Sequence, residues 1–261
     1  MIPKTIHFIY PVTSKTRPWS LVNHAAVMLA RKYHPNYKII IWTNKNPEVH
    51  YALLKTASSA DALVQSIDMP AEIGGVEIEW PQYMADVLRL QLLYASGGIY
   101  MDTDMLLRMD LNDLRKTAED HNRLLLSWET PEQTSICNAL MISPPENAFV
   151  GAWLDAMPEA LKSPTWAQGG VVLPMELSKR DSLVDSRMIL DHKLACPLDL
   201  SRPWLFDSAW REGAAAKVGH AHAVHVFETY WRDIIKDIDL DWIERTPCLF
   251  SDMFREAVGD A

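Results

Sequence analysis

ADVLRLQLLYASGGIYMDTDML, which runs from Ala85 to Leu106, joins a helix-like apolar segment to a short β-prone run through two glycines. The wider segment Pro81–Ser96 carries apolar residues on almost every side, which predicts a buried helix. Glycines commonly follow the last turn of a helix, so we expect Gly97 and Gly98 to end it. Ile99–Asp102 is then predicted to be a strand with acidic side chains at its carboxyl end.

The N-terminal part of the chain has a strand, helix, strand pattern. Thr5–Tyr10 and Tyr37–Trp42 are short apolar runs rich in β-formers. Between them, Trp19–Tyr33 has helical periodicity and follows Pro18, a residue common near the first turn of a helix. This order predicts a parallel βαβ unit and therefore an α/β fold.

The rest of the chain contains further predicted elements without a clear domain boundary. Helices are expected at Pro47–Ile67, Ala148–Leu161 and Leu173–Lys179, strands at Leu124–Trp128 and Ala139–Ser143, and a mixed connector at Pro70–Trp80. The last third of the chain is expected to be irregular. Its one short apolar run is Ala223–Phe227.

Composition narrows the possible functions. The chain has 261 residues and a formal net charge of -9, which makes it a poor candidate for binding nucleic acid. An anionic substrate would need local positive charge from Arg, Lys or a metal ion. The spacing of Cys137, Cys196 and Cys248 matches neither a disulfide framework nor a zinc knuckle, which favours a reducing compartment. No apolar run has the length of a signal peptide or a membrane span. We therefore expect a cytoplasmic protein, either free or loosely attached to the inner face of the membrane.

Asp102 and Asp104 form an Asp-x-Asp triplet with several possible meanings. In an extended segment, side chains two residues apart point to the same side, so the two carboxylates are expected to converge. Two carboxylates that close repel each other unless a cation lies between them, and hard oxygen ligands suit Mg²⁺ or Mn²⁺. One alternative is a solvated turn. Another is a phosphohydrolase of the haloacid dehalogenase type, in which Asp102 would be the nucleophile.

Asp86 and Arg89 lie three residues apart in the apolar helix, and so on one of its faces. Burying charged groups costs several kcal/mol unless they are paired or bind a ligand. The two residues are therefore either a simple helical ion pair or part of a cleft that they share with the two aspartates.

Four blocks in this order resemble the DXD-motif glycosyltransferases of the Och1-like and capsular polysaccharide type, and also the catalytic domains of large clostridial glucosylating toxins. They are IPKTIHFIY near the N-terminus, the stretch that ends in MDTDML, NALMISPPENAF (Asn138–Phe149) and AVHVFETYW (Ala223–Trp231). The resemblance implies a GT-A fold, a mostly parallel sheet flanked by helices, over a single domain 1–261. It also implies a nucleotide-sugar-binding part at about 1–110 and an acceptor and lid part at about 111–261.

The resemblance further implies a metal site. Asp104 would ligate Mn²⁺ or Mg²⁺ directly, and Asp102 would contact the donor as well as the metal. His225 is the candidate third ligand, with His222 or His220 as alternatives.

By the same resemblance, other residues would bind the nucleotide sugar. Asp86 would accept hydrogen bonds from sugar hydroxyls, and Arg89 would contact the sugar or the diphosphate. Tyr100 and Asn138 are weaker candidates for donor contacts. Tyr10 stands where the toxins stack a tryptophan on uracil, although simple core packing would also explain it. Asp86, Arg89, Asp102 and Asp104 form the predicted catalytic set.

These expectations describe a metal-dependent, retaining transferase that moves a sugar from a UDP- or GDP-sugar to a glycan, a glycolipid or another hydroxyl acceptor. Lipopolysaccharide or capsule assembly would suit a cytoplasmic enzyme. The alternatives are the Mg²⁺-dependent phosphohydrolase and a nucleotide-sugar-binding protein without turnover.

Overall fold

The computed structural model describes residues 1–44, 51–162 and 167–259, and its centre is a seven-stranded sheet ordered β10-β8-β9-β6-β1-β2-β3. In that order the strands span Arg187–Leu190, Leu124–Trp128, Ile136–Ser143, Gly98–Met101, Thr5–Tyr10, Lys38–Thr43 and Leu63–Ser66. Within this sheet only β9 runs antiparallel to its neighbours. The predicted α/β class with a mostly parallel sheet is therefore confirmed.

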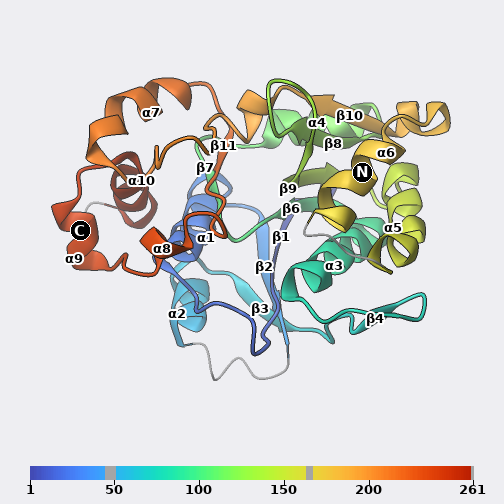
Figure 1. Ribbon diagram of the computed structural model, residues 1–261, viewed down its shortest axis with the longest axis horizontal. Helices are drawn as coiled ribbons and strands as arrows, with labels where there is room; N and C mark the ends of the chain where they lie inside the picture. The colour runs from blue at the N-terminus through green and yellow to red at the C-terminus, as the bar shows by residue number, and fades with distance from the viewer. Residues whose placement is uncertain (45–50, 163–166, 260–261) are drawn as a thin grey trace.

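Helices cover both faces of the sheet (Figure 1). The first layer includes α1 (Leu21–Tyr33) and α10 (Leu249–Val258), and the second includes α3 (Pro81–Ser96) and α5 (Ala148–Leu161). Side chains of β1 alternate between the layers: Ile6 and Phe8 pack in the first core cluster and Ile9 in the second. The central strand is thus buried on both faces, as its continuous apolar sequence requires.

The predicted βαβ unit is present at the N-terminus. β1 pairs in parallel with β2, with Ile6 opposite Ile39. The helix begins two residues later than expected, because Ser20 caps it: its hydroxyl accepts from Asn23 N at 3.3 Å, and its own N–H donates to the Asn23 side chain at 2.8 Å. Such a capping box satisfies N–H groups that the first turn would otherwise leave unpaired.

The stretch from Ala85 to Leu106 folds largely as expected. Helix α3 has the predicted bounds and ends at Gly97, whose φ of 65° favours glycine. A Cβ atom at Gly97 would also lie 2.8 Å from the backbone oxygen of Ser143. Strand β6 ends at Met101, one residue earlier than predicted, so Asp102 lies beyond the strand.

The predicted helix Pro47–Ile67 is wrong in its second half. Helix α2 spans Tyr51–Ser59, and β3 then pairs in parallel with β2 at the edge of the sheet. Asp61 adopts a φ of 47° while Ala62 N donates to the carbonyl of Ala57 at 2.8 Å, a helix ending that usually has a glycine. No glycine in the sequence therefore marks the point where helix α2 ends and the chain turns toward β3. Residues 47–50 of the prediction lie outside the described residues.

The other elements are short. They are β4 (Glu72–Ile73), β5 (Val76–Glu77), β7 (Met105–Leu107), α4 (Asn112–Asp120), the π-helical turn η2 (Gln168–Val172), α6 (Leu173–Leu177), the 3₁₀ turns η3 (Asp181–Ser186), η4 (His192–Leu194) and η5 (Ser208–Trp210), α7 (Arg211–Lys217), β11 (Ala223–His225), α8 (Arg232–Ile235) and α9 (Leu240–Arg245). The last third is thus helical where we expected irregular structure. Helices α7, α8 and α9 have seven residues or fewer, too few for periodicity to reveal them. Within the described ranges, no helix is long and apolar enough to cross a bilayer.

Candidate functional site

The two aspartates lie in a tight turn between β6 and β7. Met105 N donates to the backbone oxygen of Asp102 at 3.0 Å, which closes the turn. The expected extended geometry is therefore wrong, since a turn replaces the strand at these residues. The carboxylates nevertheless converge: oxygens of Asp102 and Asp104 and a ring nitrogen of His225 lie within 4.8 Å of one another. Two carboxylates and an imidazole form a donor set that suits Mn²⁺ or Mg²⁺.

The C-terminal segment brings His225 to this turn. Strand β11 pairs antiparallel with β7, with His225 opposite Met105. Asp104 holds the same segment, because its Oδ2 accepts from Glu228 N at 2.8 Å and its backbone oxygen accepts from Val226 N at 3.1 Å. His225 is thereby placed with the aspartates. His220 is exposed. His222 precedes β11 at the end away from the aspartate turn, where its carbonyl accepts from Arg108 N and its own N–H donates to the carbonyl of Leu194.

Charge coupling between Asp104 and His225 is strong. Burial alone would raise the pKa of Asp104, but His225 and the Glu228 N–H bring it below its ordinary value. Burial likewise opposes a charged imidazole, yet the Asp104 carboxylate raises the pKa of His225 well above its usual range. The Nε2 atom of His225 lies 3.6 Å from Asp104 Oδ1. The two groups thus form a mutually neutralising ion pair, and a metal ion held by both would take the place of the imidazole proton.

A buried arginine network adjoins the turn. Arg89, only 4% exposed, places Nη2 at 3.0 Å from Asp86 Oδ1 and 3.3 Å from Asp102 Oδ1. Its Nη1 donates to the backbone oxygen of Asn138 at 2.8 Å, and its guanidinium lies 4.5 Å from the centre of the Tyr100 ring. Arg89 is therefore both the partner in a helical ion pair and the link between that pair and Asp102.

Two further hydrogen bonds complete this network. The Tyr100 hydroxyl donates to Asp102 Oδ1, and Asn138 Nδ2 donates to Asp86 Oδ1 at 3.2 Å. Five of the predicted site residues, Asp86, Arg89, Tyr100, Asp102 and Asn138, thus form one connected cluster.

Gly170 belongs to this site but was not predicted. A Cβ atom at this position would lie 2.5 Å from Asn138 Nδ2 and 3.1 Å from both Asp86 carboxylate oxygens. The π-helical turn η2 therefore places bare backbone against the Asp86 side chain. Such turns are frequent at functional sites. The pair Gly169-Gly170 within an apolar segment was the only sequence signal.

Tyr10 occupies a different part of the site. Its ring is 6% exposed and packs edge-on against Trp19, with ring centres 5.0 Å apart. Its hydroxyl donates to the backbone oxygen of Arg17. The ring is thus buried against Trp19, which lines a large cavity, and the stacking of Tyr10 on a base stays a prediction.

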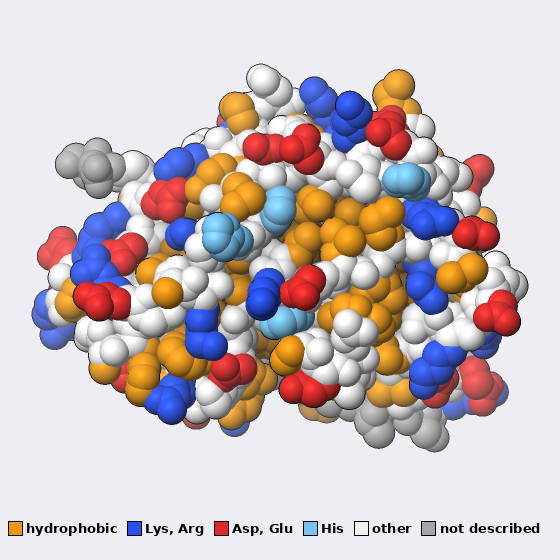
Figure 2. Space-filling model, turned by 90° about the horizontal axis from the view of Figure 1, so that it is seen from above, with side chains coloured by type: hydrophobic (Ala, Val, Ile, Leu, Met, Phe, Trp, Pro, Cys, Tyr) orange, Lys and Arg blue, Asp and Glu red, His pale blue; other side chains and the backbone are white. Residues whose placement is uncertain are grey.

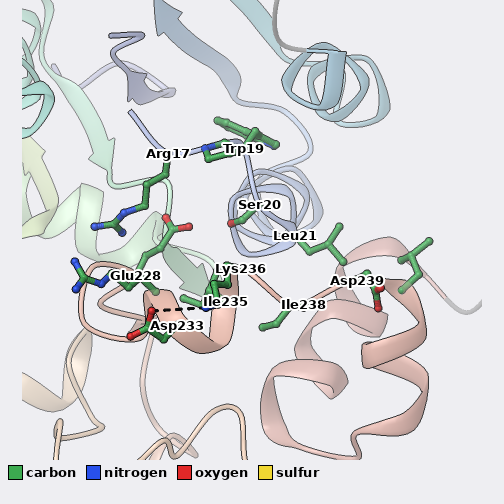
Figure 3. Close-up of a pocket in the computed structure, with 13 residues that line it drawn as sticks. Arg17, Trp19, Ser20, Leu21, Glu228, Asp233, Ile235, Lys236, Ile238 and Asp239 are labelled. Atoms are coloured by element: carbon green, nitrogen blue, oxygen red, sulfur yellow. Dashed lines mark ion pairs between the residues drawn. The ribbon is translucent and has the colours of Figure 1, made fainter. Parts of the chain in front are cut away.

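That cavity, of about 640 Å³, lies between the start of α1 and the segment 228–240. Figure 3 shows Arg17 and Glu228 approaching each other from its two walls, with Trp19 and Leu21 on one side and Ile235 and Ile238 on the other. Glu228 connects the cavity to the aspartate turn through its backbone N–H. Burial, and then the nearby Asp104, raise the pKa of its carboxyl group. Sequence reasoning did not single out Glu228, although it lies inside the AVHVFETYW block.

On the face seen in Figure 2, acidic and basic side chains are interspersed among apolar ones, and no broad basic patch is visible. The expectation that the protein does not bind nucleic acid stays a prediction.

Asp86 predicts a pH-dependent stability. Burial, opposed by Arg89, raises its pKa from 3.8 to about 6 in the folded protein, which therefore binds this proton more tightly than the unfolded chain does. Stability should fall as pH rises from about 4 to about 6, by on the order of 3 kcal/mol. Urea unfolding of the wild type and of Asp86→Asn across this pH range checks the prediction, because the variant lacks the titrating carboxyl group. Parallel stability profiles would contradict the assignment.

Comparisons with known proteins show which proteins the chain resembles. Residues 22–120 match the glycosyltransferase sugar-binding region containing the DXD motif. This part of the chain is therefore similar to the DXD-containing glycosyltransferases. Glucan organizing enzyme 1 of Cryptococcus neoformans is 28% identical over 194 residues, which are 69% of this chain and 50% of that protein. Subversion of eukaryotic traffic protein A of Legionella pneumophila is 26% identical over 169 residues, 61% of this chain and 25% of that protein. The chain thus spans half or less of the length of these curated relatives.

Solved structures support the fold. A galactosyltransferase LgtC complex superposes with a TM-score of 0.56 at 14% identity, covering 98% of this chain and 95% of that one. The PaToxG glycosyltransferase superposes with a TM-score of 0.52 at 14% identity, covering 98% and 87%. The predicted GT-A fold and the resemblance to DXD-type glycosyltransferases are thereby confirmed. The division near residue 110 stays a prediction.

Proposed function

We propose that the protein is a metal-dependent glycosyltransferase that moves a sugar from a nucleotide-sugar donor to a hydroxyl acceptor. The observation that carries this proposal is the convergence of Asp102, Asp104 and His225 beside the buried Arg89 network. In an acidic chain, a divalent ion at this point would supply the positive charge that a diphosphate needs. The similarity to the DXD family is consistent with it.

Each residue then has a definite task. Asp104 and His225 hold Mn²⁺ or Mg²⁺, with Asp102 shared between the metal and the donor. When bound, the ion neutralises charge on the departing diphosphate. Arg89 orients Asp86 and Asp102 toward the donor sugar, and its charge adds to the electrostatic stabilisation of the leaving group.

We further propose that the reaction retains the anomeric configuration by a front-face route. Asp86 accepts hydrogen bonds from Asn138 and pairs with Arg89, which suits a residue that orients sugar hydroxyls better than a free nucleophile. The acceptor hydroxyl would attack from the leaving-group side and pass its proton to the departing phosphate. Proton NMR of the first product formed gives the anomeric configuration, and an inverted product would refute this route.

The first experiment is thermal unfolding against UDP- and GDP-sugars, each with and without Mn²⁺, followed by a product assay with glycan and glycolipid acceptors. A donor at about a hundred times its dissociation constant adds roughly 2.7 kcal/mol to the free energy of unfolding. For a chain of this size, that gain raises Tm by about 5 to 10 °C. A metal-dependent shift with product supports the proposal. A shift without product indicates a binding protein, and phosphate release from simple phosphate esters would instead favour the phosphohydrolase with Asp102 as nucleophile.

We propose that the acceptor binds in the 640 Å³ cavity, because Glu228 lines this cavity and also donates its N–H to Asp104 in the aspartate turn. Leu240 lines this cavity and is 60% exposed, so Leu240→Trp should narrow it without disturbing the core. The acceptor KM is expected to rise about ten-fold with donor binding unchanged. Val184→Trp, at an exposed position in η3, is the control. An unchanged acceptor KM would place the acceptor elsewhere.

Gly170→Ala tests the role of the π-helical turn. The added methyl group would displace Asn138 and Asp86, and a misplacement of about 1 Å can cost about 100-fold in rate. We expect a loss of transfer of that size. Gly213→Ala, within α7, meets its nearest atom at an ordinary 3.6 Å and should leave the rate unchanged. Full activity of Gly170→Ala would show that the contact is not needed.

The cellular setting follows from the same proposal. Lipopolysaccharide or capsule assembly at the cytoplasmic face of the membrane would supply glycan or glycolipid acceptors. Fractionation of cells that produce the protein, with a salt wash of the membranes, tests this placement. Recovery from outside the cell would refute it.

A further inference from the structure

A second group of metal-ligating side chains lies behind the aspartate turn. Sγ atoms of Cys137 and Cys196 and a ring nitrogen of His225 lie within 4.8 Å of one another. Cys137 lies in β9, Cys196 follows η4, and His225 ends β11. Both thiols are only 3% exposed. The cluster forms because three distant segments meet, which explains why cysteine spacing alone did not predict it.

Backbone contacts hold the three residues in place. His225 N donates to the carbonyl of Ala195, the residue before Cys196, at 2.8 Å. Cys137 pairs across the sheet with Ser127 of β8. The site is thus built from rigid strands and a fixed loop, as a selective metal site requires.

One ring nitrogen of His225 points to a missing ligand. Nε2 lies toward Asp104. Nδ1 is buried and has no hydrogen bond of normal geometry with the described residues, although the Cys137 thiol interacts with the ring. A buried polar atom without a strong hydrogen bond destabilises the folded protein. A metal ion bound to Nδ1 together with the two neighbouring sulfurs would remove that cost.

We propose that Cys137, Cys196 and His225 form a binding site for a thiophilic divalent ion, with Zn²⁺ as its natural occupant. Two thiolates and an imidazole are soft to borderline ligands that select Zn²⁺ or Cd²⁺ over Mn²⁺ and Mg²⁺. Each thiol releases its proton to solvent on binding. Zn²⁺ on Nδ1 would withdraw electron density from the ring and weaken Nε2 as a ligand of the catalytic ion, so Zn²⁺ at this site inhibits transfer, a consequence that rests on the proposed function.

Cd²⁺ titration of the purified full chain tests the site itself. We expect one Cd²⁺ per chain and an ultraviolet thiolate-to-metal charge-transfer band. Cys137→Ser and Cys196→Ser should lose the band. Cys248→Ser, which changes the third buried thiol, and Asp104→Asn, which changes the aspartate site, should retain it. A wild type without the band, or a band that survives both serine changes, would overturn the proposal.

Two further measurements do not depend on the folding of a serine variant. X-ray absorption of the zinc-loaded wild type should show sulfur ligands, and a shell of nitrogen and oxygen alone would overturn the site. Zn²⁺ added in the presence of Mn²⁺ should inhibit transfer reversibly, and an unaffected rate would overturn the inhibitory role. A protein with the Cd²⁺ band but no transfer activity would support the site and refute the proposed function instead.

Discussion

Asp104→Asn is expected to lower the rate of sugar transfer by about 10³-fold, because it removes a charged ligand from the point where charge develops. The asparagine oxygen can still accept the N–H of Glu228, which Asp104 binds at 2.8 Å in the wild type. The loss of charge opposite His225 should therefore cost no more than about 2 kcal/mol of stability. A dead but folded variant would tie the carboxylate to chemistry and not to folding.

The measurement is donor turnover at saturating Mn²⁺, alongside a thermal unfolding curve for each protein. Asp110→Asn is the matched control, since Asp110 is exposed and its carboxylate accepts from Asn112 N at 2.9 Å, a bond that asparagine also allows. The control should keep wild-type activity. If Asp104→Asn kept it too, the aspartate turn would not be the metal site, and the proposed function would lose its main support.

Local signals predicted most of the fold around this site. Apolar residues all round Pro81–Ser96, followed by Gly97, predicted a buried helix and its end, because both features depend on residues close in sequence. The three-residue spacing of Asp86 and Arg89 likewise predicted a pair on one helical face, and their atoms lie 3.0 Å apart. Where neighbouring residues determine the structure, sequence reasoning succeeded.

Features that depend on tertiary contacts were missed. Strand β7 has only three residues, and it exists because β11 pairs with it from more than a hundred positions away. Strand β3 replaced a predicted helix because β2 offered it an edge to pair with. The role of Gly170 depends on the approach of η2 to Asp86, which the sequence alone does not show. Short elements carry too little periodicity for the sequence to reveal such contacts.

Arg89→Met is expected to destabilise the protein by about 3–5 kcal/mol, because it leaves the buried Asp86 carboxylate and the half-buried Asp102 carboxylate without their counter-charge. Arg89 lies between Asp86, which is 8% exposed, and Asp102. For a chain of this size that loss corresponds to a fall in Tm of roughly 10 °C. Arg211→Met is the matched control, because Arg211 forms an even closer ion pair, 2.7 Å, with Asp252 at the surface, and its loss should change Tm little.

The pH dependence of this loss separates charge from packing. Arg89 lowers the pKa of Asp86 toward its ordinary value, so its removal should move that pKa further above 6. Because a raised folded-state pKa costs stability only above the unfolded-state pKa, the deficit of Arg89→Met should be smaller at pH 5 than at pH 8. Adding Asp86→Asn should likewise recover part of the loss at pH 8. A deficit equal at both pH values and unchanged by Asp86→Asn would mean that Arg89 stabilises the site through packing against Tyr100 and not through its charge.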